Sequence, residues 1–561
     1  MIPNPWRVAP ALALQTLLLS AAAPAPAARP ATTAEAIDAM LAKAIPPSGP
    51  GAVVIAVKDG KTVFRKAYGM ANLELGVPLA PDSVLRLGSI TKQFTATAVL
   101  MLAEEGKLAL SDPITKFLPD YPTHGHVITV EHLLNHTSGI RSYTGIPGYM
   151  GTKIQADLTP AQLIDAFKSE PMDFAPGERW EYNNSGYVLL GAVIEKASGT
   201  TYAEFVAKRI FMPLGMKATA YGAEGPILPK RAAGYTRDGE TVFNARYLSM
   251  SQPYSAGALV STVDDLAAWD AALYTEKLVK KASLEKAWTP AVTRDGKPTH
   301  YGYGWGISTL RGARAIAHGG GIFGFSTYGI RLPDEKVYVA VLANSDSPKA
   351  DPGMLGKKIA ALLIGKPFPE QAPVAVAPGV LARWTGVYRF DPQTTRTVTV
   401  EGGKIYSQRS GGPRLEVKPS SETEFFYEGS LTRLQFVAGP DGRAKEVLFF
   451  PDGADGPERG VREGDVPSAP AEVKVDPALY DLYAGEYELA PGFVLTVRRD
   501  GARLLTQATG QQEFEVFPAS ETEFFLKVVD ARITFVKGAD GKVNELVLRQ
   551  GGREMPAKRR K

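Results

Sequence analysis

The chain has no cysteine among its 561 residues. This absence excludes disulfide bonds, thiolate metal sites and lipid attachment through a cysteine. An excess of one charge is missing too, because 63 Lys and Arg nearly balance 59 Asp and Glu, which leaves a formal net charge of +4. In a chain of this length such a small charge argues against a nucleic-acid-binding surface, so we expect no nucleic-acid partner.

Long apolar runs are also missing beyond the N-terminus. Arg7 precedes an apolar run from Val8 to Ala22, and small residues such as Ala25 and Ala27 follow it. This order is typical of a secretory signal peptide, which we assign to residues 1–28. The run is too short to span a bilayer comfortably. We therefore expect a periplasmic or secreted protein with no stable membrane span after processing, and an uncleaved anchor is the alternative.

The length exceeds what a single hydrophobic core usually supports, so we expect two or three domains. Between residues 33 and 365 helical and strand-like patterns alternate. Ala52–Val57 followed by Asp59-Gly60 predicts a hairpin, Ser89–Glu105 predicts a largely buried helix, and Val337–Leu342 predicts a buried strand. A Pro/Ala-rich linker follows at residues 366–380.

The remainder of the chain contains an internal repeat. The segment SETEFF at Ser421–Phe426 recurs at Ser520–Phe525, and Gly386 recurs as Gly485, both with a shift of 99 residues. A constant offset indicates duplication. Short β-type runs between Asp-Gly or Gly-Gly turns predict one small antiparallel barrel in each copy, at residues 381–452 and 477–553, with a second linker at 453–476.

The first motif with chemical content is Ser89-x-x-Lys92. At the start of a helix, residues three apart share one face, so the amine of Lys92 can reach the hydroxyl of Ser89. A serine needs a neighbouring base to act as a nucleophile, and a desolvated lysine can serve. Ser283-x-x-Lys286 has the same spacing but belongs to a polar helix, and we interpret it as exposed surface.

Two further motifs supply groups for a catalytic cleft. Tyr182-x-Asn184 stands between turn signals, so its phenol can transfer protons and its amide can orient a carbonyl group. His318-Gly319-Gly320-Gly321 precedes an aromatic strand, where a glycine lets a substrate approach a backbone N–H closely. His300 opens a similar His-x-Gly pattern, and we favour His318.

A metal site is the main alternative use of the histidines. His132 and His136 are four residues apart, but the His-Glu-x-x-His pattern is absent because Glu131 precedes the first histidine. We predict neither a metal nor a cofactor.

The order of the three motifs resembles the serine β-lactamase and penicillin-binding-protein superfamily, most closely its class C branch. The resemblance covers roughly residues 35–365 and implies an α/β fold, with an antiparallel sheet flanked by helices and an all-helical subdomain. It also implies a role for each motif residue. Ser89 attacks a carbonyl while Lys92 and Tyr182 move the proton. Substrate and oxyanion are held by Asn184, His318, Gly320 and Gly321, with the N–H groups of Ser89 and Gly321 forming the oxyanion hole.

One departure from β-lactamases bears on the substrate. Those enzymes have Lys-Thr-Gly or Lys-Ser-Gly where this chain has His318-Gly319-Gly320, and a histidine is mostly neutral at pH 7. Recognition of a substrate carboxylate should therefore be weaker.

His-x-Gly with tandem C-terminal barrels resembles the D-aminopeptidase group of the superfamily. This implies a small-molecule or short-peptide substrate, such as a D-residue peptide, amide or ester. Several alternatives stay open: a β-lactamase, a D,D-carboxypeptidase, a carboxylesterase, or a penicillin-recognising sensor without turnover. A barrel-based carrier is a further alternative.

Overall fold

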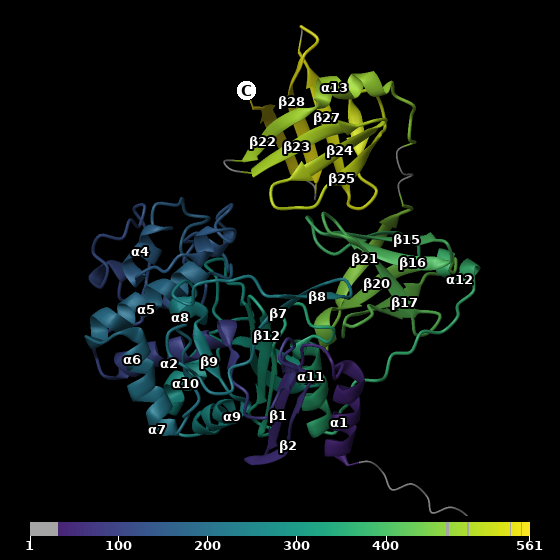
Figure 1. Cartoon of the computed structure of the whole chain (residues 1–561). Helices are drawn as coiled ribbons and strands as arrows, with labels where there is room; N and C mark the ends of the chain where they lie inside the picture. Colours follow the sequence, from purple (N-terminus) through teal and green to yellow (C-terminus); the bar gives the residue numbers. More distant parts are fainter. Residues whose placement is uncertain (1–31, 467–470, 491–492, 539, 551–552, 561) are drawn as a thin grey trace, which may run out of the picture.

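The computed structural model describes residues 32–560 except 467–470, 491–492, 539 and 551–552. The predicted signal peptide, residues 1–28, lies outside the described residues. A region of helices and sheet comes first, and two β-barrels follow it along the chain (Figure 1).

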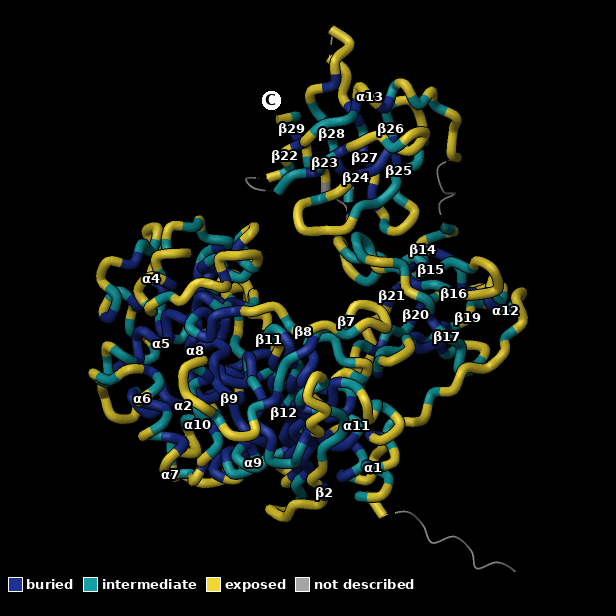
Figure 2. The backbone as a smooth tube through the Cα atoms, viewed as in Figure 1, coloured by how far each residue is buried: buried dark blue, intermediate teal, exposed yellow. Residues whose placement is uncertain are grey.

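A six-stranded sheet forms the centre of the first region, with strand order β10-β11-β12-β13-β1-β2 and every neighbouring pair antiparallel. The strands are β1 (Ala52–Lys58), β2 (Lys61–Tyr68), β10 (Gly306–Leu310), β11 (Ala313–Ile322), β12 (Phe325–Leu332) and β13 (Val337–Ala343). All residues of β13 are buried, because both faces of the sheet are covered at this point. In Figure 2 the tube around the neighbouring strand β12 is largely dark blue, the colour of buried residues. The predicted hairpin and buried strand are both present.

Helices cover both faces of the sheet. Successive residues of a strand point to opposite faces, and β1 accordingly divides its side chains between two cores. Val54 packs in a core with Ile37 of α1 (Thr33–Ala44) and Ile359 of α11 (Pro352–Leu363). Val53 packs in a second, larger core that also includes residues of α9 (Val263–Ala272).

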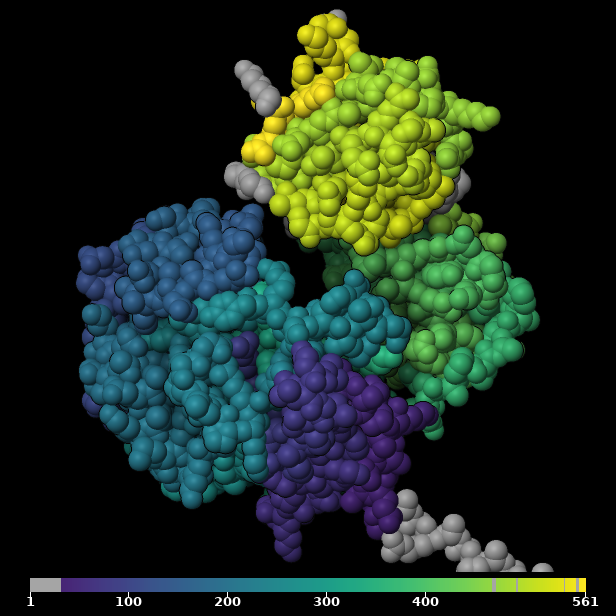
Figure 3. Space-filling view, viewed as in Figure 1, coloured from purple at the N-terminus to yellow at the C-terminus, as the bar shows by residue number. Residues whose placement is uncertain are grey.

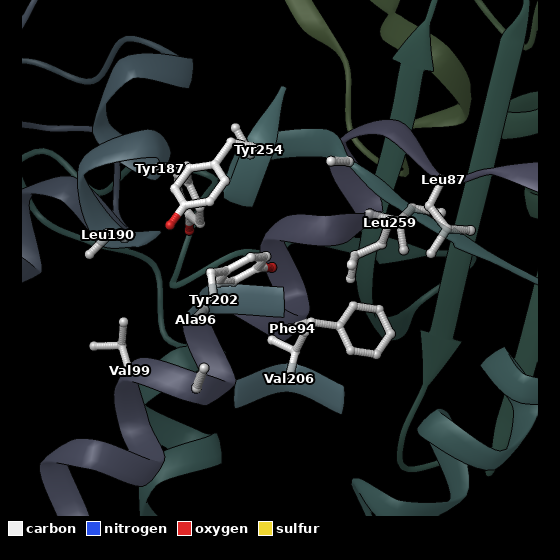
Figure 4. Close-up of a cluster of buried hydrophobic side chains, with 14 of the residues drawn as sticks. Leu87, Phe94, Ala96, Val99, Tyr187, Leu190, Tyr202, Val206, Tyr254 and Leu259 are labelled. Carbon is white, nitrogen blue, oxygen red and sulfur yellow. The ribbon is translucent and has the colours of Figure 1, made fainter. Parts of the chain in front are cut away.

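The second core continues into a helical region built around α2 (Thr91–Glu104), whose residues are buried without interruption from Thr91 to Leu102. Figure 4 shows Phe94 and Val99 of this helix in one hydrophobic cluster with Tyr202 and Tyr254. The other helices of the region are α3 (Val130–Leu134), α4 (Pro160–Asp165), α5 (Asn184–Ser198), α6 (Tyr202–Val206), α7 (Met212–Leu214), α8 (Tyr254–Gly257) and α10 (Lys281–Ala287).

Short strands connect the helical region to the sheet. They are β3 (Met70–Asn72), β4 (Val77–Pro78), β5 (Leu85–Arg86), β6 (Ala220–Tyr221), β7 (Tyr235–Asp238), β8 (Thr241–Asn244) and β9 (Leu259–Ser261). The strand β5 pairs with β9 immediately before Ser89, so the backbone that leads to this serine is held on one side by a strand.

Each copy of the repeat forms the predicted antiparallel barrel, and the structure shows that each barrel is closed and has eight strands. The first copy comprises α12 (Pro378–Ala382), β14 (Gly386–Arg389), β15 (Thr395–Glu401), β16 (Lys404–Arg409), β17 (Arg414–Pro419), β18 (Glu424–Phe426), β19 (Arg433–Ala438), β20 (Ala444–Phe450) and β21 (Glu458–Gly464). The second comprises α13 (Tyr480–Tyr483), β22 (Gly485–Ala490), β23 (Phe493–Asp500), β24 (Arg503–Ala508), β25 (Phe514–Pro518), β26 (Glu523–Phe525), β27 (Ala531–Lys537), β28 (Val543–Gln550) and β29 (Arg553–Arg559).

The last strand of each barrel lies beyond the boundary expected from the sequence. β21 falls inside the segment 453–476 that we assigned to a linker, and β29 extends past residue 553. β21 reads Glu-Arg-Gly-Val-Arg-Glu-Gly and exposes Val461, so it has no apolar alternation to predict a strand. The segment is a strand because its backbone pairs with β14 and β20, and this pairing closes the barrel.

The two barrels repeat their local contacts as well as their strands. The hydroxyl of Tyr388 donates a hydrogen bond to the carbonyl of Trp384, and that of Tyr487 donates to the carbonyl of Tyr483. In the repeated SETEFF segment, the side chain of the first serine accepts the N–H three residues later at 2.9 Å in both copies. The repeat in the sequence is therefore a repeat of structure.

The first barrel contacts the sheet-containing region at two aspartates. Asp455 accepts the N–H of Gly312 at 2.8 Å, and Asp452 forms an ion pair with Lys357 of α11. Within the described ranges, no helix has the length and apolar character needed to cross a membrane.

Candidate active site

Ser89 lies on a single 3₁₀ turn, Gly88–Ile90, that leads into α2. Gly88 has φ of 55°, a left-handed conformation that favours glycine. A Cβ atom at Gly88 would lie 3.0 Å from the backbone nitrogen of Gly321. The turn therefore brings the backbone beside Ser89 close to that of Gly321, as an oxyanion hole shared by these two residues requires.

Two hydrogen bonds hold the turn from opposite sides. The N–H of Leu87 donates to the carbonyl of Leu259 in β9 at 2.9 Å. The hydroxyl of Thr327 in β12 donates to the carbonyl of Leu87 at 2.7 Å. Ser89 is thus positioned by both the sheet and the helical region.

Lys92 lies one helical turn after Ser89 and is fully buried. Its Nζ is 3.0 Å from the Ser89 hydroxyl oxygen, 2.9 Å from Oδ1 of Asn184 and 2.9 Å from the carbonyl oxygen of Ala256. No carboxylate is among these partners, and burial lowers the pKa of the Lys92 ammonium well below its ordinary value. The lysine therefore has both the position and the tendency to lose a proton that a base for Ser89 needs.

Asn184 and Tyr182 lie at the N-terminus of α5. Asn183 caps this helix by accepting the N–H of Gly186 at 2.8 Å. Asn184 accepts from Lys92 with its side-chain oxygen and donates from its nitrogen to the hydroxyl of Thr144 at 3.1 Å. The capping geometry and the two side-chain bonds fix the amide within the site.

The phenol of Tyr182 contacts the same lysine. Lys92 Nζ lies 4.8 Å from the centroid of the Tyr182 ring. The Tyr182 hydroxyl oxygen is buried and makes no hydrogen bond of normal geometry with a described residue; the Ser89 hydroxyl is the described group beside it that acts on it as a hydrogen-bonding partner. Burial raises the pKa of this phenol above its ordinary value, and the nearby Ser89 hydroxyl partly opposes the rise. A buried hydroxyl without a well-formed hydrogen bond costs stability, which is typical of groups kept for chemistry.

His318 lies on β11 and is buried behind Tyr182, at 6.1 Å between ring centroids. Its Nδ1 donates to the carbonyl of Gly319 at 2.5 Å, so Nε2 is left to accept from the hydroxyl of Tyr301 at 2.8 Å. Burial lowers the His318 pKa to about 3. A neutral imidazole agrees with the weak carboxylate recognition expected from the sequence.

The adjacent glycines of β11 face different surroundings. A Cβ atom at Gly320 would lie 1.9 Å from the carbonyl oxygen of Leu87, so Gly320 allows β11 to pass close to the turn that contains Ser89. At Gly321 a Cβ atom would have nothing within 4 Å. Gly321 faces open space next to Ser89.

A cavity of about 320 Å³ opens in front of the serine. Ser89, Asn184 and Gly321 line it, whereas Lys92, Tyr182, His318 and Gly320 lie behind its wall. The rest of the lining is Gly88, Tyr143, Thr144, Met150, Ile154, Leu248, Pro253, Ala256, Gly257, Ile322, Phe323 and Asp346. In Figure 3 the surface is hollowed between the helical region and the β7–β8 hairpin.

Two residues beside the site were missed by the motif analysis. The ring of His136 lies 4.4 Å from that of Tyr182, and its Nδ1 accepts the N–H of Asn183 at 3.1 Å. Asp346 lines the cavity from the loop after β13. Neither belongs to one of the three motifs. The only sequence signal was the stretch His132–Ile140, which supported the resemblance and contains His136.

The competing motifs lie elsewhere. Ser283 donates to Glu104 at 2.6 Å on the surface, and Lys286 forms an ion pair with Glu131, so this second Ser-x-x-Lys does not bring its two side chains together. His300 is exposed. Among the residues that the structure describes, no three His, Asp or Glu side chains are grouped so that they could hold a metal ion.

Comparison with known proteins agrees with this geometry. Residues 38–363 match the family described as Beta-lactamase, and residues 469–559 match one described as Domain of unknown function (DUF3471). The chain is 31% identical to Penicillin-binding protein 4* of Bacillus subtilis over 73% of this chain and 94% of that protein. It is 28% identical to a D-aminopeptidase of Gluconobacter oxydans over 61% of this chain and 65% of that protein.

A solved structure gives a similar result. The octameric penicillin-binding protein homologue from Pyrococcus abyssi superposes with a TM-score of 0.55 and 29% identity, over 76% of this chain and 99% of that one. The order of the motifs, the antiparallel sheet flanked by helices, and a family match that spans more than half of the residues lead to one conclusion: the chain belongs to the β-lactamase family.

Proposed function

We propose that the protein is a serine hydrolase that forms an acyl-enzyme on Ser89 and cleaves amide or ester bonds of small substrates containing D-amino acids. The observation that carries the proposal is the contact between Lys92 Nζ and the Ser89 oxygen at 3.0 Å, inside a site where the lysine is buried without a carboxylate partner.

The sequence pattern of residues 1–28 supports export of the protein. N-terminal sequencing of the mature protein tests whether this segment is removed.

The acylation step follows from these positions. Neutral Lys92 accepts the Ser89 proton as the oxygen attacks a carbonyl carbon, and the N–H groups of Ser89 and Gly321 stabilise the oxyanion. Tyr182, in contact with the lysine, delivers a proton to the departing amine or alcohol. Water then hydrolyses the ester, with the same groups working in reverse.

Two observations support D-amino-acid amides or peptides over acidic antibiotics. The neutral His318 replaces the lysine that binds the substrate carboxylate in β-lactamases, and one similar protein is a D-aminopeptidase. Weaker attraction for a carboxylate disfavours a β-lactam acid or a C-terminal carboxylate. It does not affect a substrate with an amide, anilide or ester at that end.

The test compares the purified mature protein with Ser89→Ala on three substrates: D-alanine p-nitroanilide, a short-chain p-nitrophenyl ester and nitrocefin. Ser283→Ala is the matched control, because it removes the serine of the second Ser-x-x-Lys pattern. We expect turnover of the D-anilide that is lost in Ser89→Ala and kept in Ser283→Ala. Equal activity of Ser89→Ala and the unaltered protein would refute the proposal, and cleavage of the ester or nitrocefin alone would refute its substrate part.

A penicillin-recognising protein without turnover is the second candidate, favoured by the 31% identity to Penicillin-binding protein 4*. Intact-mass spectrometry after incubation with a β-lactam distinguishes the two. A stable adduct on Ser89, with one burst of product and no steady state, identifies the second candidate.

A further inference from the structure

The cavity in front of Ser89 contains one carboxylate in a mostly apolar wall. Tyr143, Met150, Leu248 and Phe323 contribute much of that wall, and among the described residues that line it Asp346 is the only carboxylate. The same set of described lining residues contains no lysine, arginine or histidine. A charged group beside apolar side chains is poorly solvated, so it attracts a charge of opposite sign more strongly than it would in water.

Asp346 is also held in place by several bonds. Its Oδ2 accepts the hydroxyl of Thr236 and the N–H of Gly324, both at 2.8 Å, and its Oδ1 accepts the hydroxyl of Ser347 at 3.1 Å. A carboxylate has about four acceptor positions, so about one remains free on Oδ1. Within the described ranges Asp346 takes part in no ion pair. The guanidinium carbon of Arg246 lies 5.3 Å from the ring centroid of Phe323, which lines the cavity, and this guanidinium donates to the carbonyls of Met150 and Gly151.

The carboxylate lies within substrate reach of the oxyanion position. Gly324, which Asp346 binds, is three residues from Gly321 across the β11–β12 turn. Three residues span at most about 10 Å even when fully extended. That figure is an upper bound, and an acyl group of one or two residues attached to Ser89 extends about 3.5–7 Å in the same direction.

We propose that Asp346 determines specificity by binding an ammonium group at the N-terminal end of the substrate's acyl part. The cavity then selects a short acyl group with an apolar body and a free, cationic amine. This inference rests on the proposed function, because it takes the Ser89 cavity as the acyl site. According to this inference, a preference for substrates with a free N-terminus comes from Asp346, a residue of the sheet-containing region, and not from either barrel.

The test uses D-alanine p-nitroanilide, D-alanyl-D-alanine p-nitroanilide and the N-acetyl form of each, at about pH 6.5, where an α-amine of pKa about 7.7–8.0 is protonated. The measured quantity is the ratio of kcat/KM for the free substrate to kcat/KM for its acetylated form. In Asp346→Asn we expect this ratio to fall about 10- to 100-fold at one of the two lengths, since a hydrogen bond to a charged group is lost. The matched control is Glu240→Gln, which removes an exposed carboxylate from the turn of the β7–β8 hairpin and should keep the ratio.

Two results would overturn the inference. One is an unchanged ratio in Asp346→Asn at both lengths. The other is a parallel loss on free and acetylated substrates, which would mean that Asp346 only holds the β11–β12 turn.

Binding is measured separately, so that failed catalysis does not decide the matter. In Ser89→Ala protein, calorimetry compares D-alaninamide with N-acetyl-D-alaninamide, before and after Asp346→Asn. Tighter binding of the free amine that depends on Asp346 supports the inference even if no turnover is found, in which case only the proposed function fails. Equal binding of D-alaninamide and N-acetyl-D-alaninamide to the Ser89→Ala protein contradicts the inference about Asp346.

Discussion

Adjacent glycines on β11 should respond in opposite ways to the same substitution. In Gly320→Ala the new Cβ atom would lie 1.9 Å from the carbonyl oxygen of Leu87 and 2.3 Å from the hydroxyl of Thr327. Because real Cβ contacts are essentially never below 3.0 Å, β11 and the Leu87 backbone must separate by more than 1 Å. In Gly321→Ala the new atom has nothing within 4 Å, and Gly321 is not among the glycines with positive φ.

The magnitudes follow from the contacts. Overpacking costs about 1–3 kcal/mol, and loss of the bond from Thr327 to Leu87 adds about 1 kcal/mol. These two costs sum to about 2–4 kcal/mol. At about 2–4 °C per kcal/mol for a domain of 150–250 residues, the unfolding temperature of Gly320→Ala should fall by about 4–16 °C. That of Gly321→Ala should change by no more than about 4 °C, because a Gly to Ala change at a compatible site alters stability by less than about 1 kcal/mol.

Differential scanning calorimetry measures both variants, with the barrel transitions as internal references. In addition, a displacement of about 1 Å at the Ser89 turn should lower kcat about 100-fold in Gly320→Ala. Equal unfolding temperatures for the two variants, or full activity in Gly320→Ala, would refute the proposed close approach of β11 to this turn.

Three further outcomes are expected. Tyr182→Phe should lower kcat by about 10²–10⁴-fold without lowering the unfolding temperature, because the lost hydroxyl is buried and makes no hydrogen bond of normal geometry with a described residue; a drop in both would contradict this. Arg331→Met should destabilise the protein by about 3–5 kcal/mol at pH 8 in urea unfolding, because it leaves the buried Asp270 carboxylate, 2.9 Å from Arg331 Nε, without its cation. Burial raises the Asp270 pKa from 3.8 to about 6, so protonation of Asp270 favours the folded state. The stability that Asp270 protonation contributes is complete below pH 3.8 and is lost as the pH rises through 6. The loss of stability caused by Arg331→Met should therefore be smaller at pH 5 than at pH 8. Finally, His318→Ala should lose activity while the exposed His300→Ala keeps it, and the reverse result would move the site to the other His-x-Gly pattern.

The sequence predicts what depends on short-range patterns. The three motifs gave Ser89, Lys92, Asn184 and Gly321, which the fold gathers around one cavity or directly behind it. The repeat with an offset of 99 residues predicted two equivalent barrels, since two segments of similar sequence are expected to form the same strands.

What the sequence could not predict depends on pairing across long separations. Hydrogen bonds from Thr236 and Gly324 hold the Asp346 side chain at the cavity, and no local sequence pattern indicates these partners. Val461 is exposed on a strand of mostly charged residues, and only its pairing with β14 and β20 makes that segment a strand. His136 was weighed as a metal ligand because spacing alone does not show that its ring packs against Tyr182.

The pairing of β1 with β13 has a consequence for biosynthesis. Ala52 lies opposite Ala343, so the central sheet joins segments almost three hundred residues apart in the chain. A ribosome must therefore complete most of this region before its sheet can close, and such non-local contacts slow folding. Each barrel, in contrast, joins mainly neighbouring strands and can form soon after it is synthesised. A nascent chain cut short before β13 would leave β1 and β2 as an unprotected hairpin, whereas one cut after α11 would have every strand of the sheet.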